Sequence, residues 1–197
     1  MNFSTGSVAP AIILPLRYYF SRYSSGANLV WNEDEQKRTM DIYEAFDANR
    51  TPLQEKPRIV VSRGAFNAGK TGLSDNLAEG KQFSLTRGNK ALTNMTIYQG
   101  SATVTVEAKN KGTCELLADM ALHFLIWSRP IICDAMGWKD FAMPIRVTDC
   151  LGNMSEDPNN TIFQVQMDVP WMKEEHWSVK TDGGELKKIL ENVHLAP

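Results

Sequence analysis

The chain has 197 residues, of which 43% are hydrophobic and 22% charged, which is typical of one soluble globular protein. Its formal net charge of −2 lacks the strong basic excess of a duplex-DNA-binding protein. The three cysteines, Cys114, Cys133 and Cys150, are an odd number without close pairs, which argues against a disulfide framework and a zinc site and favours buried thiols.

The N-terminal part contains an apolar run, residues 8–16, which Pro10 and Pro15 interrupt. A membrane span needs about 20 apolar residues, so this run predicts neither a span nor a signal peptide, and we expect no membrane association. A helix is expected over residues 12–23, beginning near Pro15, because proline is tolerated in a first helical turn. Together with short strands expected at 29–31 and 39–46, this helix forms an N-terminal extension, residues 1–56.

The main domain is expected to cover residues 57–197, and its first strand is the apolar segment 58–63. The following segment, Gly64–Lys90, is rich in glycine, lysine and arginine, with scattered apolar residues. Segments of this length without regular periodicity are usually functional or disordered in compact domains. We therefore expect a long loop or extended hairpin that protrudes from the domain.

A hairpin and a helix are expected at the centre of the domain. Residues 92–98 and 101–108 alternate as strands, and Gln99-Gly100 between them predicts a turn. Thr113 is the expected N-cap of a helix that ends at Arg129-Pro130. Its apolar stripe has helical spacing and consists of Leu116, Leu117, Met120, Ala121, Phe124 and Leu125.

The remaining elements are shorter. Strands are expected at 131–132, 143–148, 161–169 and 176–179, and a terminal helix is expected over 184–193, with Leu186, Ile189 and Leu190 facing inward. The fold class that follows is α+β: a mostly antiparallel sheet packed against one central helix, with an N-terminal helix and a short C-terminal helix.

One motif suggests an enzyme. Gly64–Thr71 matches the P-loop pattern GxxxxGK[ST], in which Lys70 would reach a terminal phosphate and Thr71 would bind magnesium. However, Gly72 follows where a P-loop needs a helix, and the chain lacks the strand–helix alternation of a parallel nucleotide-binding sheet. A nucleotide-binding enzyme therefore stays the alternative to a protein without catalytic activity.

The other candidate chemistry is weaker. The patterns GxSxG, HExxH and CxxC do not occur in the sequence. His123 shares a helix face with Glu115 and Asp119, but a stripe of this kind is far more often solvated surface than a metal site. We expect no catalytic residue, no cofactor and no metal.

The order of the expected elements resembles that of the tail-terminator (tail-completion) and neck proteins of tailed bacteriophages. The stretch that carries the resemblance is Gly100–Ala121, where a strand, a glycine turn and a Glu-x-x-Ala helix are similar to the core of that family. Phe163–Trp171 resembles its closing strand. The similarity covers residues 57–180 as a pattern, and the first 56 residues are more than a minimal member carries.

The resemblance implies a structural virion protein, made in the host cytoplasm. It would form a ring, typically a hexamer, at the head–tail junction, where it caps the tail tube, joins it to the head connector and lets DNA pass through its lumen. The implied partners are copies of the chain, head-connector or neck proteins, and tail-tube or tail-sheath proteins. A head-closure or tail-tube subunit is the structural alternative.

The protruding segment 64–90 is the candidate docking element for such partners. Its apolar anchors would be Phe66, Leu73 and Phe83, and its charged rim would be Lys81 and Arg87. The mild acidity of the chain fits a channel that should not hold DNA tightly, since phosphate contacts would slow its passage.

Overall fold

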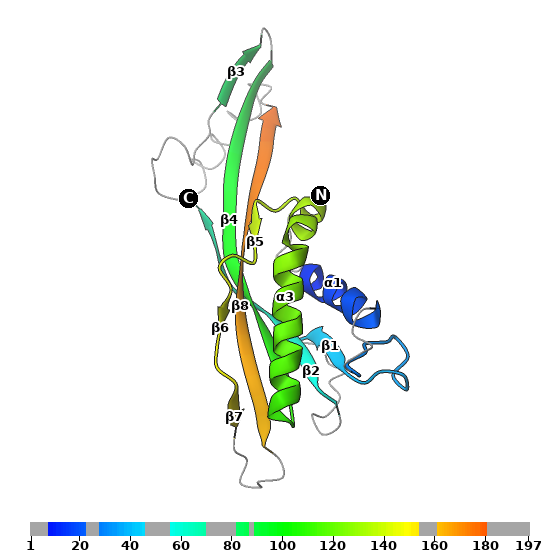
Figure 1. Cartoon of the computed structure of the whole chain (residues 1–197). Coiled ribbons are helices and arrows are strands. Elements are labelled where there is room, and N and C mark those ends of the chain that lie inside the picture. The colour runs from blue at the N-terminus through cyan, green and yellow to red at the C-terminus, as the bar shows by residue number, and fades with distance from the viewer. Residues whose placement is uncertain are drawn as a thin grey trace, which may run out of the picture. The chain divides into compact units, whose positions relative to one another are not determined.

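A computed structural model describes residues 8–22, 28–45, 56–69, 82–86, 89–153 and 161–180. Its helices are α1 (Val8–Arg22) and α3 (Lys111–Met136). Its strands are β1 (Asp41–Glu44), β2 (Arg58–Gly69), β3 (Gln82–Thr86), β4 (Asn89–Ala108), β5 (Asp140–Phe141), β6 (Arg146–Val147), β7 (Leu151–Asn153) and β8 (Ile162–Lys180). Two helices and a mixed sheet confirm the predicted α+β class (Figure 1).

The chain divides into two compact units, one of Met1–Phe66 with Gln99–Met172 and one of Asn67–Tyr98 with Lys173–Pro197. The sheet has the strand order β1-β2-β4-β8-β5, with β6 and β7 also paired to β8. β1 and β2 are parallel, whereas β5, β6 and β7 are antiparallel to β8. In the second unit β3 pairs antiparallel with β4, from Thr86↔Asn89 to Gln82↔Thr93.

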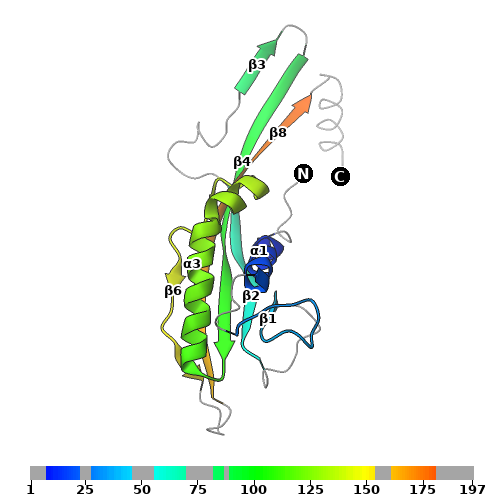
Figure 2. The ribbon, with the colours of Figure 1, turned by 45° about the vertical axis from the view of Figure 1, so that its right-hand side comes forward.

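The core of the first unit lies between the two helices and one face of the sheet (Figure 2). Along β4 the buried residues Ala102, Val104, Val106 and Ala108 alternate with half-buried polar ones, as a strand with one covered face requires. α3 contributes Leu117, Ala121 and Leu125, all 0% exposed, and α1 contributes Ile12, Leu16 and Phe20. Residues of the predicted N-terminal extension thus form part of the same core.

The hairpin predicted at Gln99-Gly100 is wrong, because β4 continues through these residues as one strand of 20 residues. The reason for the glycine is close packing. A Cβ at Gly100 would lie 2.8 Å from the Phe66 Cβ and 2.9 Å from the Trp171 ring, too close for any other residue without a shift. β8 is likewise continuous, so the separate strands expected at 161–169 and 176–179 are one element.

α3 begins and ends differently from the prediction. Asn110 is the N-cap, and its side-chain oxygen accepts a hydrogen bond from the Thr113 backbone N–H, so Thr113 lies within the first turn. The helix passes through Pro130 and ends at Gly137, which has a left-handed φ of 61°. Gly137 and Trp138 donate backbone hydrogen bonds to Asp134 and Cys133, a Schellman ending.

The strand predicted at 131–132 is therefore wrong, because those residues continue α3. α1 also starts earlier than predicted, at Val8, and it contains Pro15 in its interior. Each interior proline removes one helical hydrogen bond, and the burial of neighbouring side chains such as Leu16 and Ile132 offsets that loss. No strand forms at 29–31, whereas the one expected at 39–46 is shortened to β1 and that at 143–148 to β6.

Arg17 joins α1 to the parallel edge of the sheet. Its guanidinium donates two hydrogen bonds, of 2.6 and 3.0 Å, to the Ile42 carbonyl oxygen in β1. It also lies over the Trp31 ring, 5.0 Å from the ring centre. These contacts, together with the buried apolar face of α1, fix the position of this helix beside α3. The predicted helix at 184–193 lies outside the described residues.

Candidate functional site

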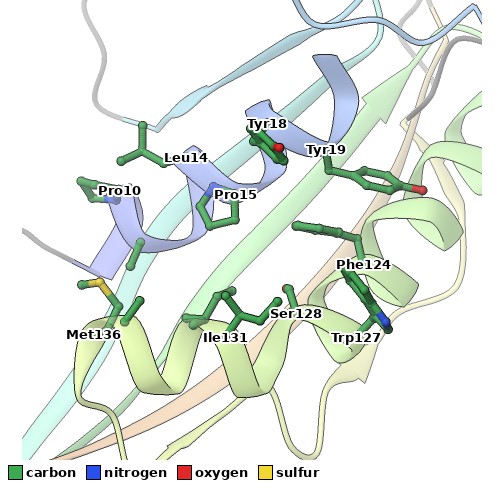
Figure 3. Close-up of a pocket in the computed structure, with 13 residues that line it drawn as sticks. Pro10, Leu14, Pro15, Tyr18, Tyr19, Phe124, Trp127, Ser128, Ile131 and Met136 are labelled. Carbon is green, nitrogen blue, oxygen red and sulfur yellow. The ribbon is translucent and has the colours of Figure 1, made fainter. Parts of the chain in front are cut away.

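An apolar groove with a volume of about 570 Å³ lies between α1 and α3 in the first unit (Figure 3). One wall comes from α1 and the other from the C-terminal half of α3. We call it the α1–α3 groove, and its lining residues are Pro10, Ala11, Leu14, Pro15, Tyr18, Tyr19, Phe124, Trp127, Ser128, Ile131, Ile132, Ala135 and Met136.

Helical spacing explains how the two walls form. Leu14 and Tyr18 are four residues apart on α1, and Trp127 and Ile131 are four apart on α3, so each pair lies on one helix face. At the end of the groove near the C-terminus of α1, the Tyr19 and Phe124 rings stack with centres 4.5 Å apart. The helices run in opposite directions there, since Pro10 lies near Met136 and Tyr19 near Phe124.

The groove exposes a large apolar surface in one place. Trp127 is 71% exposed, Leu14 63%, Ile131 60% and Tyr18 53%. With large side chains presenting roughly 150–250 Å² each, these four expose on the order of 500 Å². That is close to the largest apolar patch of a typical monomer, and such patches mark interaction sites.

The chemistry of the groove suits binding rather than catalysis. The Ser128 hydroxyl donates to the Leu125 carbonyl oxygen at 3.4 Å within its own helix. The remaining lining residues are apolar or aromatic, with no carboxylate, imidazole or thiol among them. The groove therefore fits an apolar side-chain ridge of a partner.

The opposite face of the sheet is polar, and we call it the polar sheet face. Apart from Val60, the alternate residues of β2 and β4 on this face are polar, and β8 adds further polar ones; the polar residues are Arg58, Ser62, Thr103, Thr105, Glu107, Gln166 and Asp168. Arg58 and Glu107 form an ion pair across β2 and β4 with side chains only 12% and 17% exposed. Thr103 donates a hydrogen bond of 3.1 Å to Asp168, which links β4 to β8. Glu107 thus neutralises the charge of Arg58, and Thr103 donates to the carboxylate of Asp168, so these charged groups on this face have partners.

The structure describes only part of the predicted docking segment. Phe66 lies in β2 and is 43% exposed, as an anchor would require. Phe83 lies in β3, of which only the backbone is described. Leu73, Lys81 and Arg87 lie outside the described residues. Whether the five residues form one docking surface therefore stays a prediction.

The first residues of the P-loop pattern are not a loop. Gly64–Gly69 form the second half of β2, so the backbone there is extended instead of curled around a phosphate. A Cβ at Gly64 would lie 2.7 Å from the carbonyl oxygen of Ser101, so this glycine allows close approach of β2 and β4. Lys70 and Thr71 lie outside the described residues.

Potential metal ligands do not converge in the described part of the chain, where no group of three or more was found. His123 and Asp119 form an exposed pair on α3, with Nδ1 3.2 Å from the carboxylate. The three cysteines are free thiols. Burial, followed by the neighbouring Cys150, raises the pKa of Cys114 to about 12, so this thiol stays protonated and unreactive near neutral pH.

By length and composition, α3 is the one helix in the described ranges that is long and apolar enough to cross a membrane. Core helices of soluble proteins meet the same criterion, and α3 packs on the sheet through Leu117, Ala121 and Leu125. The two most exposed apolar residues of α3, Trp127 and Ile131, line the α1–α3 groove.

Sequence reasoning missed this groove because it placed both helix boundaries wrongly. With a helix starting near Pro15, Pro10 and Leu14 have no common face with Tyr18. With a helix ending at Pro130, Ile131 does not continue the face of Trp127. The i, i+4 pairs of large apolar residues outside the main stripe are the signal that marks the site.

No protein-family model matches the chain, and no curated protein sequence matches it.

Proposed function

We propose that the chain is a structural subunit of the neck of a tailed bacteriophage. Copies of it form a closed ring, typically of six, that caps the tail tube and joins it to the head connector, with a lumen for DNA. The observation that carries the assembly part of this proposal is the α1–α3 groove, whose exposed apolar surface has the size and position of an interaction site.

The neck position rests on the resemblance. The stretch on which the resemblance is based, Gly100–Ala121, consists of the second half of β4 and the first half of α3. These two elements form the strand–helix pair at the centre of the described core. The α+β fold class agrees with this expectation. The resemblance therefore rests on residues that specify the fold, while the partners remain part of the proposal.

The charge distribution of the polar sheet face is also compatible with the lining of a channel through which DNA passes. Its Arg58 side chain is paired with Glu107, and the acidic Asp168 accepts from Thr103. Uncompensated lysines and arginines would bind phosphates and release counterions, which would retard the DNA. Together with the formal net charge of −2, these contacts support a channel that lets DNA slide.

The test combines mass measurement with imaging. The purified chain, alone and with tail-tube protein, is analysed by native mass spectrometry, and assembled particles are imaged by negative-stain electron microscopy. A ring of defined symmetry at the head-proximal end of the tail is expected, and particles made without the chain should carry unjoined tails of uncontrolled length.

Other outcomes would replace the proposal. Open stacks of the chain would identify a tail-tube subunit, and a ring bound to the head side only would identify a head-closure protein. Nucleotide binding or hydrolysis by the chain that Lys70→Ala abolishes would support the P-loop alternative, whereas particle assembly that this substitution leaves unaltered would count against that alternative.

A further inference from the structure

The α1–α3 groove has the dimensions of a site for one short helix. Leu14 to Tyr18 and Trp127 to Ile131 each span one helical turn. At 1.5 Å per residue, the lining residues extend the walls to about 14 Å on α1 (Pro10 to Tyr19) and about 18 Å on α3 (Phe124 to Met136). Two helices side by side leave a furrow that a third helix fills with side chains at i, i+3, i+4 and i+7. The occupant should therefore be an amphipathic helix of two to three turns.

A closed ring of more than two subunits restricts what that occupant can be. If two grooves met face to face, the contact would be isologous and would end at a dimer. A ring needs a heterologous contact, in which the groove of one copy receives a different element of the next copy. This step rests on the proposed function.

The chain itself supplies one segment of the required pattern. β8 ends at Lys180, and residues 181–197 follow it. Within them, Leu186, Ile189, Leu190 and Val193 have the spacing i, i+3, i+4 and i+7, while Glu185, Lys187, Lys188 and Glu191 occupy the other positions. The distance from Leu186 to Val193 along a helix is about 10 Å, so these four side chains fit within the length of either wall of the groove.

We propose that the C-terminal segment, residues 184–193, of one copy docks as a helix in the α1–α3 groove of the neighbouring copy. The aliphatic side chains at 186, 189, 190 and 193 lie between Leu14 and Tyr18 on one wall and Trp127 and Ile131 on the other. Each copy then donates its own C-terminal segment to one neighbour and receives the segment of the other neighbour, so the same contact repeats around the ring.

The experiment uses two full-length variants that each remove one half of the contact. Ile131→Glu places a charge in the groove at a side chain that is 60% exposed, so the fold is retained. The double variant Leu186→Glu/Ile189→Glu removes the apolar face of the segment. The matched controls are Leu116→Glu, at another exposed residue of α3 about 22 Å along the helix from Ile131, and Lys188→Ala on the polar face of the segment.

Native mass spectrometry with one variant labelled with ¹⁵N gives the readout. Each half-contact variant alone should be monomeric, while the controls should assemble as the wild type does. Mixed one to one, the two half-contact variants should form a heterodimer and nothing larger, because one intact segment meets one intact groove. At least a hundredfold weaker self-association is expected for each variant alone.

Four results would overturn the inference. They are a mixture that stays monomeric, variants that still form rings, a segment variant that dimerises through its groove alone, and a wild-type chain that is monomeric at high micromolar concentration. A segment variant that dimerises would point to a face-to-face dimer of two grooves. A monomeric wild-type chain would point to a groove filled from within the same chain or by a different protein. The proposed function is judged separately, by the ring in imaged particles.

Discussion

The ion pair between Arg58 and Glu107 allows a quantitative test of the sheet. The two side chains join β2 and β4 on the polar sheet face, with exposures of 12% and 17%. The Arg58 guanidinium also lies 5.9 Å from the centre of the buried Tyr43 ring. Glu107→Gln keeps the shape of the side chain but leaves the guanidinium without its carboxylate, and the perturbation is therefore almost purely electrostatic.

The magnitude follows from burial. Two unit charges about 4 Å apart interact with about 1 kcal/mol in water and about 4 kcal/mol at an effective dielectric constant of 20. Removing one partner of a buried pair typically costs 3–5 kcal/mol, because the remaining charge is uncompensated. Since both side chains keep some exposure, we expect Glu107→Gln to lower the free energy of unfolding by about 2–3 kcal/mol.

A second pair provides the control. Arg63 and Glu44 join β1 and β2 at 3.6 Å, but their side chains are 40% and 31% exposed. Glu44→Gln should cost less than about 1 kcal/mol, and 0.5 M salt should remove most of that effect. Urea denaturation followed by circular dichroism measures both variants. Equal losses for the two pairs, or a loss below 1 kcal/mol for Glu107→Gln, would refute the reasoning from burial.

Three further predictions concern α3, β4 and a buried thiol. Asn110→Ala should lower the stability by about 1 kcal/mol through the lost N-cap, while Thr113→Ala, which leaves the cap in place, should change it by less than half as much in urea denaturation. Gly100→Ala should cost about 1–3 kcal/mol, seen as a lower Tm, because its new methyl group has no space, and an unchanged Tm would contradict the continuous strand. Burial raises the pKa of Cys114 from 9.0 to about 12, so its contribution to stability is complete well below pH 9 and is lost as the pH rises toward 12. Between pH 9 and 10.5 the free energy of unfolding of the wild type should therefore fall by about 1.5 kcal/mol more than that of Cys114→Ser, measured as the pH dependence of unfolding.

The sequence predicted the elements whose signals are local. The alternation over residues 101–108 and the apolar stripe from Leu117 to Leu125 come from one strand and one helix that each bury a single face, so their periods were readable. The signals that failed depend on distant contacts. Gly100 is a glycine because residues 66 and 171 pack against it, and no neighbour in the sequence reports that.

The site was harder to predict than the fold. Pro15 and Pro130 are usual helix-boundary signals, yet both lie inside helices that tertiary packing maintains. Because these two boundaries were misplaced, the sequence interpretation divided the groove residues among a helix, a loop and a strand. The docking anchors were instead sought in the glycine-rich segment, and of the three predicted anchors Phe66 is the one whose side chain the structure describes.

The two interior prolines have a mechanical consequence for the groove. Pro15 has no N–H for the carbonyl of Ala11, and Pro130 has none for that of Ile126, so each helix lacks one rung of its hydrogen-bond ladder beside the groove. A helix bends at lower cost where a rung is missing. Each helix can thus bend slightly beside the groove while its buried residues stay packed in the core. The groove can therefore accept side chains of slightly different size without a rearrangement of the sheet beneath it.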